Sequence, residues 1–135
     1  MTQGTYTILV NLPKAARVAV GALGEVAFDA GWYAYTGSAF GPGGFARVDR
    51  HHEMAAGDRD TRHWHVDYLL GDTPASIATV VRTPEDDIEC AVARAVGEVG
   101  AAVDGFGASD CDCAAHLHYH AERKPLLDAV KGAHG

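Results

Sequence analysis

The segment WYAYTGSAFGPGGFAR, residues 32–47, leads from an aromatic run through a glycine-rich stretch toward a polar segment. Trp32 to Thr36 has the aromatic composition of a β-strand, and we expect Gly37 to end it. Residues 45–56 have the pattern of a helix, in which Arg47 and His51 are four positions apart and share one face. The segment therefore predicts a strand, a turn and a helix, and such a turn presents backbone N–H groups that suit a phosphate.

The rest of the chain alternates short strand and helix signals without internal repeats. Residues 63–70, HWHVDYLL, fit either a short helix or a strand. Further strands are expected at residues 5–12, 17–20, 25–29, 76–81 and 117–120, with the strand at 76–81 buried. Short connections between the early strands favour an α+β fold with a small, largely antiparallel central sheet flanked by helices. At 135 residues, one domain spans the chain, with a core at 4–120 and a C-terminal helix at 124–131.

The clearest helix start is predicted at Thr83, which would be the N-cap, with Pro84 in the first helical position. Glu85 and Asp86 follow, where negative charge favours the positive end of the helix dipole. The apolar stripe of this helix contains Ile88, Val92, Ala95, Val96 and Val99. We expect Gly97 and Gly100 to end it, and residues 105–115 to form a loop.

Composition indicates a globular protein of the cytoplasm. No apolar run approaches the length of a membrane span, so no membrane partner is expected, and the segment MTQGTYTILVNLPK lacks the basic start of a signal peptide. Three cysteines favour a reducing compartment over a disulfide framework. The net charge of −7 disfavours a nucleic-acid partner, but twelve aspartates against three lysines would suit a salty cytoplasm. In that case the local charge around the site says more about its partner than the net charge of the chain does.

The glycine loop does not match the phosphate loops of nucleotide-binding proteins. It lacks the lysine of G-x-x-x-x-G-K-[ST], because no lysine follows these glycines before Arg47. The G-x-G-x-x-G fingerprint and its later acidic residue are also absent. A nucleotide cofactor is therefore not expected.

Five motifs in order resemble another group of proteins. Gly4-Thr5-Tyr6 and Tyr35-Thr36-Gly37 are two tripeptides in neighbouring predicted strands, and Arg47 follows in a helix. Together with HWHVDYLL, the IEC of residues 88–90 and GFGASDCDCAAHLHY at 105–119, they resemble the GIY-YIG nuclease superfamily. The similarity is to its Uri-type branch, small domains that are sometimes fused to endonuclease III-like DNA glycosylases, and it covers about residues 4–120.

The resemblance implies roles for single residues. Tyr6 and Tyr35 match the two motif tyrosines, one of which would help to activate the attacking water. Arg47 matches an arginine that binds the scissile phosphate. His51 matches a position that contacts the phosphate or the tyrosine. Glu89 matches the one metal-binding glutamate, which would hold Mg²⁺ or Mn²⁺. One carboxylate with water and phosphate oxygens is a typical Mg²⁺ site, and an arginine fork suits phosphate.

The chain departs from the family pattern at three points, one of which is a loop from Gly37 to Arg47 that is a little longer than in many relatives. The first motif is GTY, and Thr5 should point away from Tyr6 in a strand, so little consequence is expected. The asparagine that often follows the glutamate helix has no counterpart, and the segment from Asp110 to His116 stands in its place. Arg50 and His52 are expected to be solvated.

A cysteine- and histidine-rich segment suggests a second site in the cleft or a metal centre. Cys111, Cys113 and His116 are residue types that bind zinc, and His63 or His65 would have to supply the fourth ligand. However, the C-x-C pair lacks the usual spacing of zinc ligands. His63, His65 and Asp67 also resemble the motif of metallo-β-lactamase-like hydrolases, without its following histidine. Alternatively, Leu117 and Tyr119 are core residues and the neighbouring histidines are solvated.

Three functions follow from these alternatives. The first is a Mg²⁺-dependent endonuclease that hydrolyses nucleic-acid phosphodiesters, with DNA favoured over RNA. The second is a nucleic-acid-binding module that does not cut and works beside DNA repair. The third is a zinc-stabilised structural domain. Substrate specificity and oligomeric state do not follow from these residues.

Overall fold

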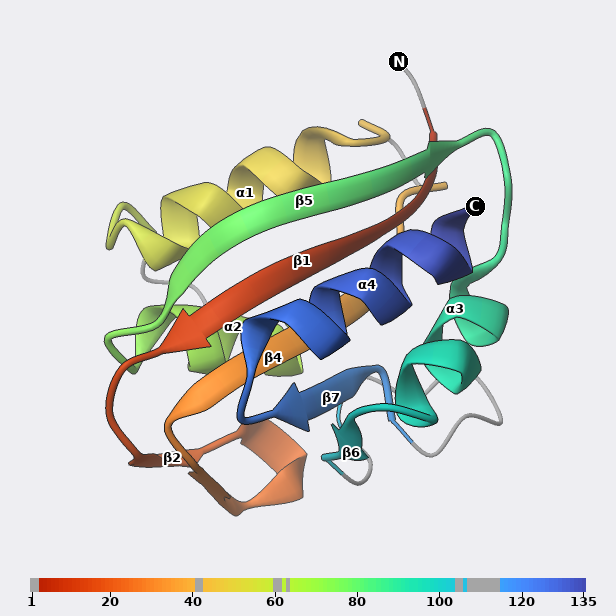
Figure 1. The fold of residues 1–135 in the computed structure, drawn as a ribbon. Helices are drawn as coiled ribbons and strands as arrows, with labels where there is room; N and C mark the ends of the chain where they lie inside the picture. The colour runs from red at the N-terminus through yellow and green to blue at the C-terminus, as the bar shows by residue number, and fades with distance from the viewer. Residues whose placement is uncertain (1–2, 41–42, 60–61, 63, 104–105, 107–114) are drawn as a thin grey trace.

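An antiparallel five-stranded sheet forms the centre of the molecule in the computed structural model (Figure 1), which describes residues 3–40, 43–59, 62, 64–103, 106 and 115–135. The strand order is β5-β1-β4-β7-β6. The strands are β1 (Gly4–Leu12), β4 (Gly31–Ser38), β5 (Ser76–Pro84), β6 (Ala101–Ala102) and β7 (Leu117–His120). A separate hairpin pairs β2 (Ala16–Ala19) with β3 (Glu25–Phe28) around a 3₁₀ turn at Gly21–Leu23. The predicted α+β fold with an antiparallel sheet is confirmed.

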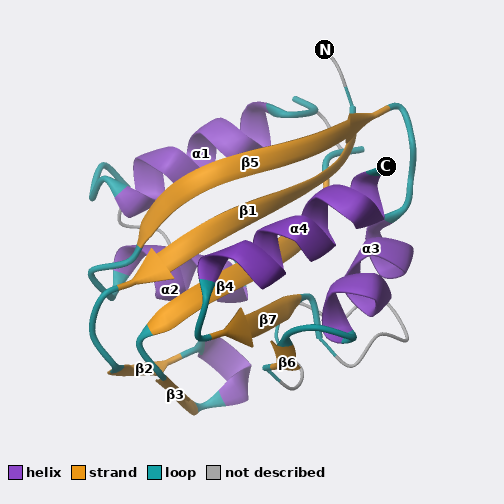
Figure 2. Ribbon diagram, in the orientation of Figure 1, coloured by secondary structure: helices purple, strands orange, loops and turns teal. Residues whose placement is uncertain are grey.

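Helices cover both faces of the sheet (Figure 2). The helices of the described residues are α1 (Ala46–Ala55), α2 (His65–Gly71), α3 (Glu89–Gly97) and α4 (Arg123–His134). Helices α1 and α2 pack on the face that carries Tyr6 and Tyr35, here called the tyrosine face. Helices α3 and α4 pack on the opposite face, here called the threonine face because Thr5, Thr7, Thr36 and Thr83 lie on it. Of the segment 63–70, whose pattern fits either a helix or a strand, residues 65–70 are helical and belong to α2.

Strand β1 is buried along almost its whole length. It lies between β5 and β4, and helices cover it on both sides. Ile8 and Val10 enter the larger core on the tyrosine face, whereas Leu9 enters a smaller core with residues of α3 and α4. Burial on both faces explains its nearly continuous run of apolar and threonine side chains.

Strand β5 is an edge strand, and the expectation that it is buried is wrong. It pairs with β1 alone, and its side chains alternate between exposed and half-buried positions. Val80 packs on the core of the tyrosine face and Val81 on that of the threonine face. An edge position leaves one side of the strand without a neighbour, and this accounts for the exposure that its apolar sequence did not indicate.

The helix start predicted at Thr83 is also wrong. Thr83 and Pro84 continue β5, paired with Thr5 and Gly4 of β1. The chain then turns at Glu85, which has a φ of 68°, and the helix begins at Glu89. Pairing with β1 outweighs the local capping signal, and an edge strand tolerates a proline. The helix ends at Gly97 as predicted.

Strand β4 extends past its expected end. Gly37 lies inside it, opposite Tyr6, and the strand continues to Ser38. Strand β7 has the predicted bounds, but the solvated reading of its histidines is wrong for His116 and His118, which are 3% and 4% exposed.

The C-terminal helix is longer than predicted and its end is bound to the sheet. Nε2 of His134 lies 2.8 Å from the Thr7 hydroxyl, and its Nδ1 lies 2.8 Å from the Thr83 hydroxyl. The Thr7 hydroxyl also bonds that of Thr36, at 2.9 Å. These contacts join three strands to the last turn of α4. Within the described residues, none of the helices has the length and apolar character that crossing a membrane requires.

Candidate functional site

The two motif tyrosines lie on neighbouring strands and face the same side of the sheet. Tyr6 of β1 is opposite Gly37 of β4. Tyr35, two residues before Gly37 on β4, is opposite Ile8 of β1. A Cβ on Gly37 would lie 2.5 Å from the Tyr6 hydroxyl. Glycine is therefore required at position 37 because the Tyr6 ring leans across β4, toward Tyr35 and α1.

His51 of α1 contacts the Tyr6 hydroxyl. Its Nε2 is 2.7 Å from that oxygen, and its side chain is fully buried. Burial is the main reason that the pKa of His51 falls to about 4, so the ring is neutral at pH 7. Its Nδ1 has no hydrogen-bond partner among the described residues. A buried N–H without a partner is costly, which favours the tautomer in which Nε2–H donates to the Tyr6 oxygen.

Both tyrosines are held in their neutral form. Burial is the largest cause that raises the pKa of Tyr6 and of Tyr35, and the negative charge of Glu89 raises both further. The positive charge of Arg47 acts in the opposite direction on each. Ionisation of either tyrosine therefore needs more positive charge nearby than Arg47 alone supplies.

Arg47 lies in the first turn of α1, where its side chain is held at the edge of the tyrosine pair. Its Nη1 donates to the Ser38 carbonyl at 2.6 Å. The guanidinium also lies over the Trp64 ring, 4.6 Å from the ring centroid. The group is half-buried and has no carboxylate within ion-pair distance among the described residues. Its remaining N–H groups are suited to bind an anion.

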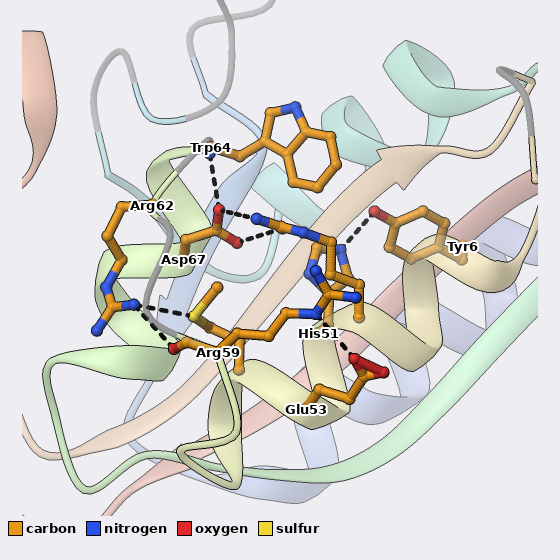
Figure 3. A network of polar contacts seen from close by, with 9 residues as sticks. Tyr6, His51, Glu53, Arg59, Arg62, Trp64 and Asp67 are labelled. Atoms are coloured by element: carbon orange, nitrogen blue, oxygen red, sulfur yellow. Dashed lines mark hydrogen bonds and ion pairs between the residues drawn. The ribbon is translucent and has the colours of Figure 1, made fainter.

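A buried ion pair connects α1 with α2, and Figure 3 shows its carboxylate, Asp67, next to Trp64. The two Arg50 amino groups donate to the two carboxylate oxygens of Asp67, at 2.9 and 3.0 Å. Asp67 is fully buried and also accepts the Trp64 backbone N–H at 2.9 Å. The Arg50 guanidinium lies 4.4 Å from the Trp64 ring centroid. The expectation that Arg50 is solvated is wrong, because its charge neutralises Asp67, whereas His52 is exposed as predicted.

Glu89 is the first residue of α3, and Thr5 places this helix start. The Thr5 hydroxyl donates to the Asp86 carbonyl at 2.8 Å and accepts the Ile88 N–H at 3.0 Å. Thr5 does point away from Tyr6, but its consequence is larger than expected, since it ties β1 to the segment before Glu89. A carboxylate oxygen of Glu89 is 3.7 Å from His116 Nδ1, and burial lowers the pKa of His116. A neutral His116 would not form an ion pair with Glu89 through this contact.

The other predicted residues are dispersed or lie outside the described residues. His65 begins α2 and meets the Phe106 ring edge-on at 5.5 Å. His63, Asp110, Cys111 and Cys113 lie outside the described residues. Among the residues that the structure does describe, no three His, Cys, Asp or Glu side chains are arranged to hold a metal ion together. The described site is thus Tyr6, Tyr35, Arg47, His51 and Glu89, with Asp67 engaged by Arg50.

Comparison with known proteins gives a family. The model of a domain of unknown function, DUF123, matches residues 5–135. The chain belongs to the DUF123 family. No curated protein and no solved structure gives a significant match to this DUF123 domain.

Sequence reasoning missed two side chains that hold the DUF123 site together. Trp64 contacts the guanidinium groups of both Arg47 and Arg50, and Thr5 orients the start of α3. Trp64 lies in a segment whose pattern fits either a helix or a strand. The sequence therefore does not predict that Trp64 lies against the arginines of α1. Strand alternation predicts only that Thr5 points away from Tyr6. It does not indicate which backbone groups lie on that face of the sheet.

Proposed function

We propose that this DUF123 domain is a metal-dependent endonuclease that hydrolyses phosphodiester bonds of nucleic acid, as its resemblance to the GIY-YIG superfamily implies. One observation carries the proposal. The Tyr6 hydroxyl is bound by a buried neutral histidine, and two opposite charges act on it. One is Arg47, which has no carboxylate partner among the described residues, and the other is Glu89, which also acts on Tyr35. These are the group types that phosphodiester hydrolysis requires: a proton acceptor, a phosphate ligand and a metal ligand.

Arg47 would bind the scissile phosphate. Its contacts with the Ser38 carbonyl and the Trp64 ring fix the guanidinium in place before substrate arrives. A planar fork fixed in this way binds phosphate oxygens in a defined orientation. The charge that develops on those oxygens in the transition state would be stabilised by the same N–H groups.

Tyr6 would accept the proton of the attacking water. Only its phenolate form can do so, and His51 Nε2–H and the Arg47 charge both stabilise that form. The proton passes from water to the Tyr6 oxygen as the water oxygen bonds to phosphorus and the bond from phosphorus to the leaving sugar oxygen breaks, and the leaving oxygen takes a proton from solvent. Binding a cation near Glu89 would remove one cause of the raised tyrosine pKa and so favour this step.

Glu89 would hold the metal ion. Its side chain is 23% exposed, and a single partly exposed carboxylate fits Mg²⁺ or Mn²⁺, which keep several water ligands and take others from phosphate. When bound, such an ion neutralises charge on the phosphate and on the leaving oxygen. A zinc centre would need Cys111 and Cys113, which lie outside the described residues.

The test is incubation of the pure protein with plasmid, single-stranded DNA and RNA, in Mg²⁺, Mn²⁺ or EDTA, at low and high KCl. We expect cutting that EDTA abolishes and that Glu89→Gln reduces by about 100-fold or more. Glu98→Gln is the matched control, since Glu98 is an exposed carboxylate at the other end of the same helix. Equal cutting by the two variants would remove Glu89 from the site.

Binding without cleavage is the second candidate, and one observation favours it. Burial raises the pKa of both tyrosines, so neither is an effective base unless a cation is bound. In that case wild-type protein would retard DNA or RNA on a gel in Mg²⁺ without cutting it, and Arg47→Ala would weaken the binding.

A further inference from the structure

Arg82 lies next to the proposed site on a different element. It belongs to the edge strand β5 and is the register partner of Tyr6 on β1. Directly opposed residues of antiparallel strands point to the same face, so Arg82 is on the tyrosine face. Its side chain is exposed. A positively charged group therefore flanks Tyr6 on the side away from Tyr35.

The Arg82 guanidinium is directed toward the start of α1. It lies over the Phe45 ring, 5.5 Å from the ring centroid, and Phe45 is the residue before α1. The Phe45 ring in turn packs over Gly4, where an added Cβ would lie 3.0 Å from it. Arg82 thus contacts the residue that precedes α1, two positions before Arg47 in the chain.

Charge pairing distinguishes these two arginines from most others near α1. Arg50, Arg59 and Arg62 each lie within 3.0 Å of a carboxylate. Neither Arg47 nor Arg82 has such a partner among the described residues. In a chain of net charge −7, two arginines without acidic partners on either side of Tyr6 form a local site for anions.

An exposed aromatic side chain lies at the same end of the sheet. Phe40 is 37% exposed, one of two large apolar side chains that are exposed among the described residues. Its carbonyl accepts a hydrogen bond from the Gln3 side chain, which holds it beside the start of β1. Exposed aromatic rings next to arginines are the usual means of binding single-stranded nucleic acid, because bases stack on the rings and phosphates bind the arginines.

We infer that Arg82 and Phe40 extend the site into a binding surface for a single nucleic-acid strand. Arg82 binds a phosphate next to the one held by Arg47, and Phe40 stacks an unpaired base. The inference rests on the proposed function and adds a substrate class to it, a strand whose bases are unpaired beside the scissile phosphate.

The test measures binding of a fluorescent single-stranded oligonucleotide and of its duplex in EDTA, by anisotropy, over a series of KCl concentrations. Arg82→Ala should weaken single-strand binding about five- to tenfold and reduce the slope of log K against log [KCl] by about 0.7. Phe40→Ala should weaken it about fivefold with the slope unchanged. Arg17→Ala removes the same charge from the distant β2–β3 hairpin and should have neither effect.

The outcomes separate the two proposals. If wild-type protein binds but Arg82→Ala and Arg17→Ala are within twofold of each other, the extended surface is wrong and the proposed function stands. If wild-type protein prefers the duplex, the single-strand assignment is wrong. If it binds neither oligonucleotide, the proposed function and the inference both fail. Thermal unfolding by circular dichroism confirms that each variant is folded.

Discussion

The two faces of the central sheet bury polar groups in different ways. On the threonine face, Thr5 bonds two backbone groups before α3, and Thr7 bonds both Thr36 and His134. Each of these hydroxyl groups joins elements that are distant in sequence. These hydrogen bonds fix α3 and α4 on the sheet. The threonine hydroxyls bond other groups of the protein.

On the tyrosine face, some groups that can form hydrogen bonds or ion pairs do not do so among the described residues. His51 bonds Tyr6 through one nitrogen only, and Arg47 has no acidic partner among the described residues. A buried nitrogen in this state costs stability, and Nδ1 of His118, opposite Ala34 on the threonine face, is in the same state. The feature that distinguishes the tyrosine face is therefore the half-buried Arg47 guanidinium. We infer from this difference that the hydroxyls of the threonine face hold the helices in place, whereas the proposed chemistry belongs to the tyrosine face together with Glu89 at the start of α3.

The largest expected effect is loss of cutting when Arg47 is removed. Arg47→Ala should reduce the rate by about 100- to 1000-fold, because its N–H groups would stabilise the phosphate in the transition state. Arg47→Lys should recover only part of the rate, since a lysine lacks the fork. Single-turnover cleavage measures this, and a near wild-type rate for the alanine variant would break the assignment of chemistry to this face.

The next effect is on stability, at the buried pair between α1 and α2. Asp67→Ala leaves Arg50 without its partner in a largely buried position, and we expect a loss of about 3 kcal/mol in the free energy of unfolding. The control is Glu25→Ala, which breaks the exposed Arg17–Glu25 pair and should cost less than about 1 kcal/mol. Urea unfolding that shows equal losses would mean that the Asp67 pair is no more than a surface contact.

A pH effect should follow from His51. Its folded pKa of about 4 lies below the ordinary value of 6.5, so the unfolded chain binds a proton that the folded chain does not between these values. Stability is therefore lost as pH falls from about 6.5 toward 4. Wild-type protein should lose about 2 kcal/mol more between pH 7 and pH 5 than His51→Gln loses.

The neighbouring His52→Gln is the control for that measurement, because His52 is exposed on the same helix. It should keep the wild-type dependence on pH. Matching pH dependence in His51→Gln and wild-type protein would show that His51 is not the group that titrates.

The smallest effect is expected on the threonine face. His134→Ala removes hydrogen bonds to Thr7 and Thr83 and should cost about 1 to 2 kcal/mol of stability. Cutting by the folded variant should stay within threefold of wild type. A tenfold loss of rate without a loss of stability would contradict the division between the two faces.

Sequence predicted the neighbours of Tyr6 better than the ends of the helices and strands. The resemblance to the GIY-YIG tripeptides implied that Tyr6 and Tyr35 lie on adjacent strands, and helix periodicity put Arg47 and His51 on one face of α1. Sequence assigned Thr83 and Pro84 to a helix because their capping signal is local, whereas pairing with β1 is not. The burial of Arg50 and the contacts of Trp64 depend on how α1 meets α2, which no local pattern encodes.

The most direct test of the account compares two buried tyrosines of the same face. Tyr6→Phe removes the hydroxyl that His51 binds, whereas Tyr33→Phe removes one that donates to the Asp29 carbonyl, away from the site. In single-turnover cleavage with Mg²⁺ or Mn²⁺, we predict a loss of at least about 100-fold for Tyr6→Phe and less than about threefold for Tyr33→Phe. Equal rates for the two folded variants would contradict the claim that Tyr6 and His51 form the reacting centre.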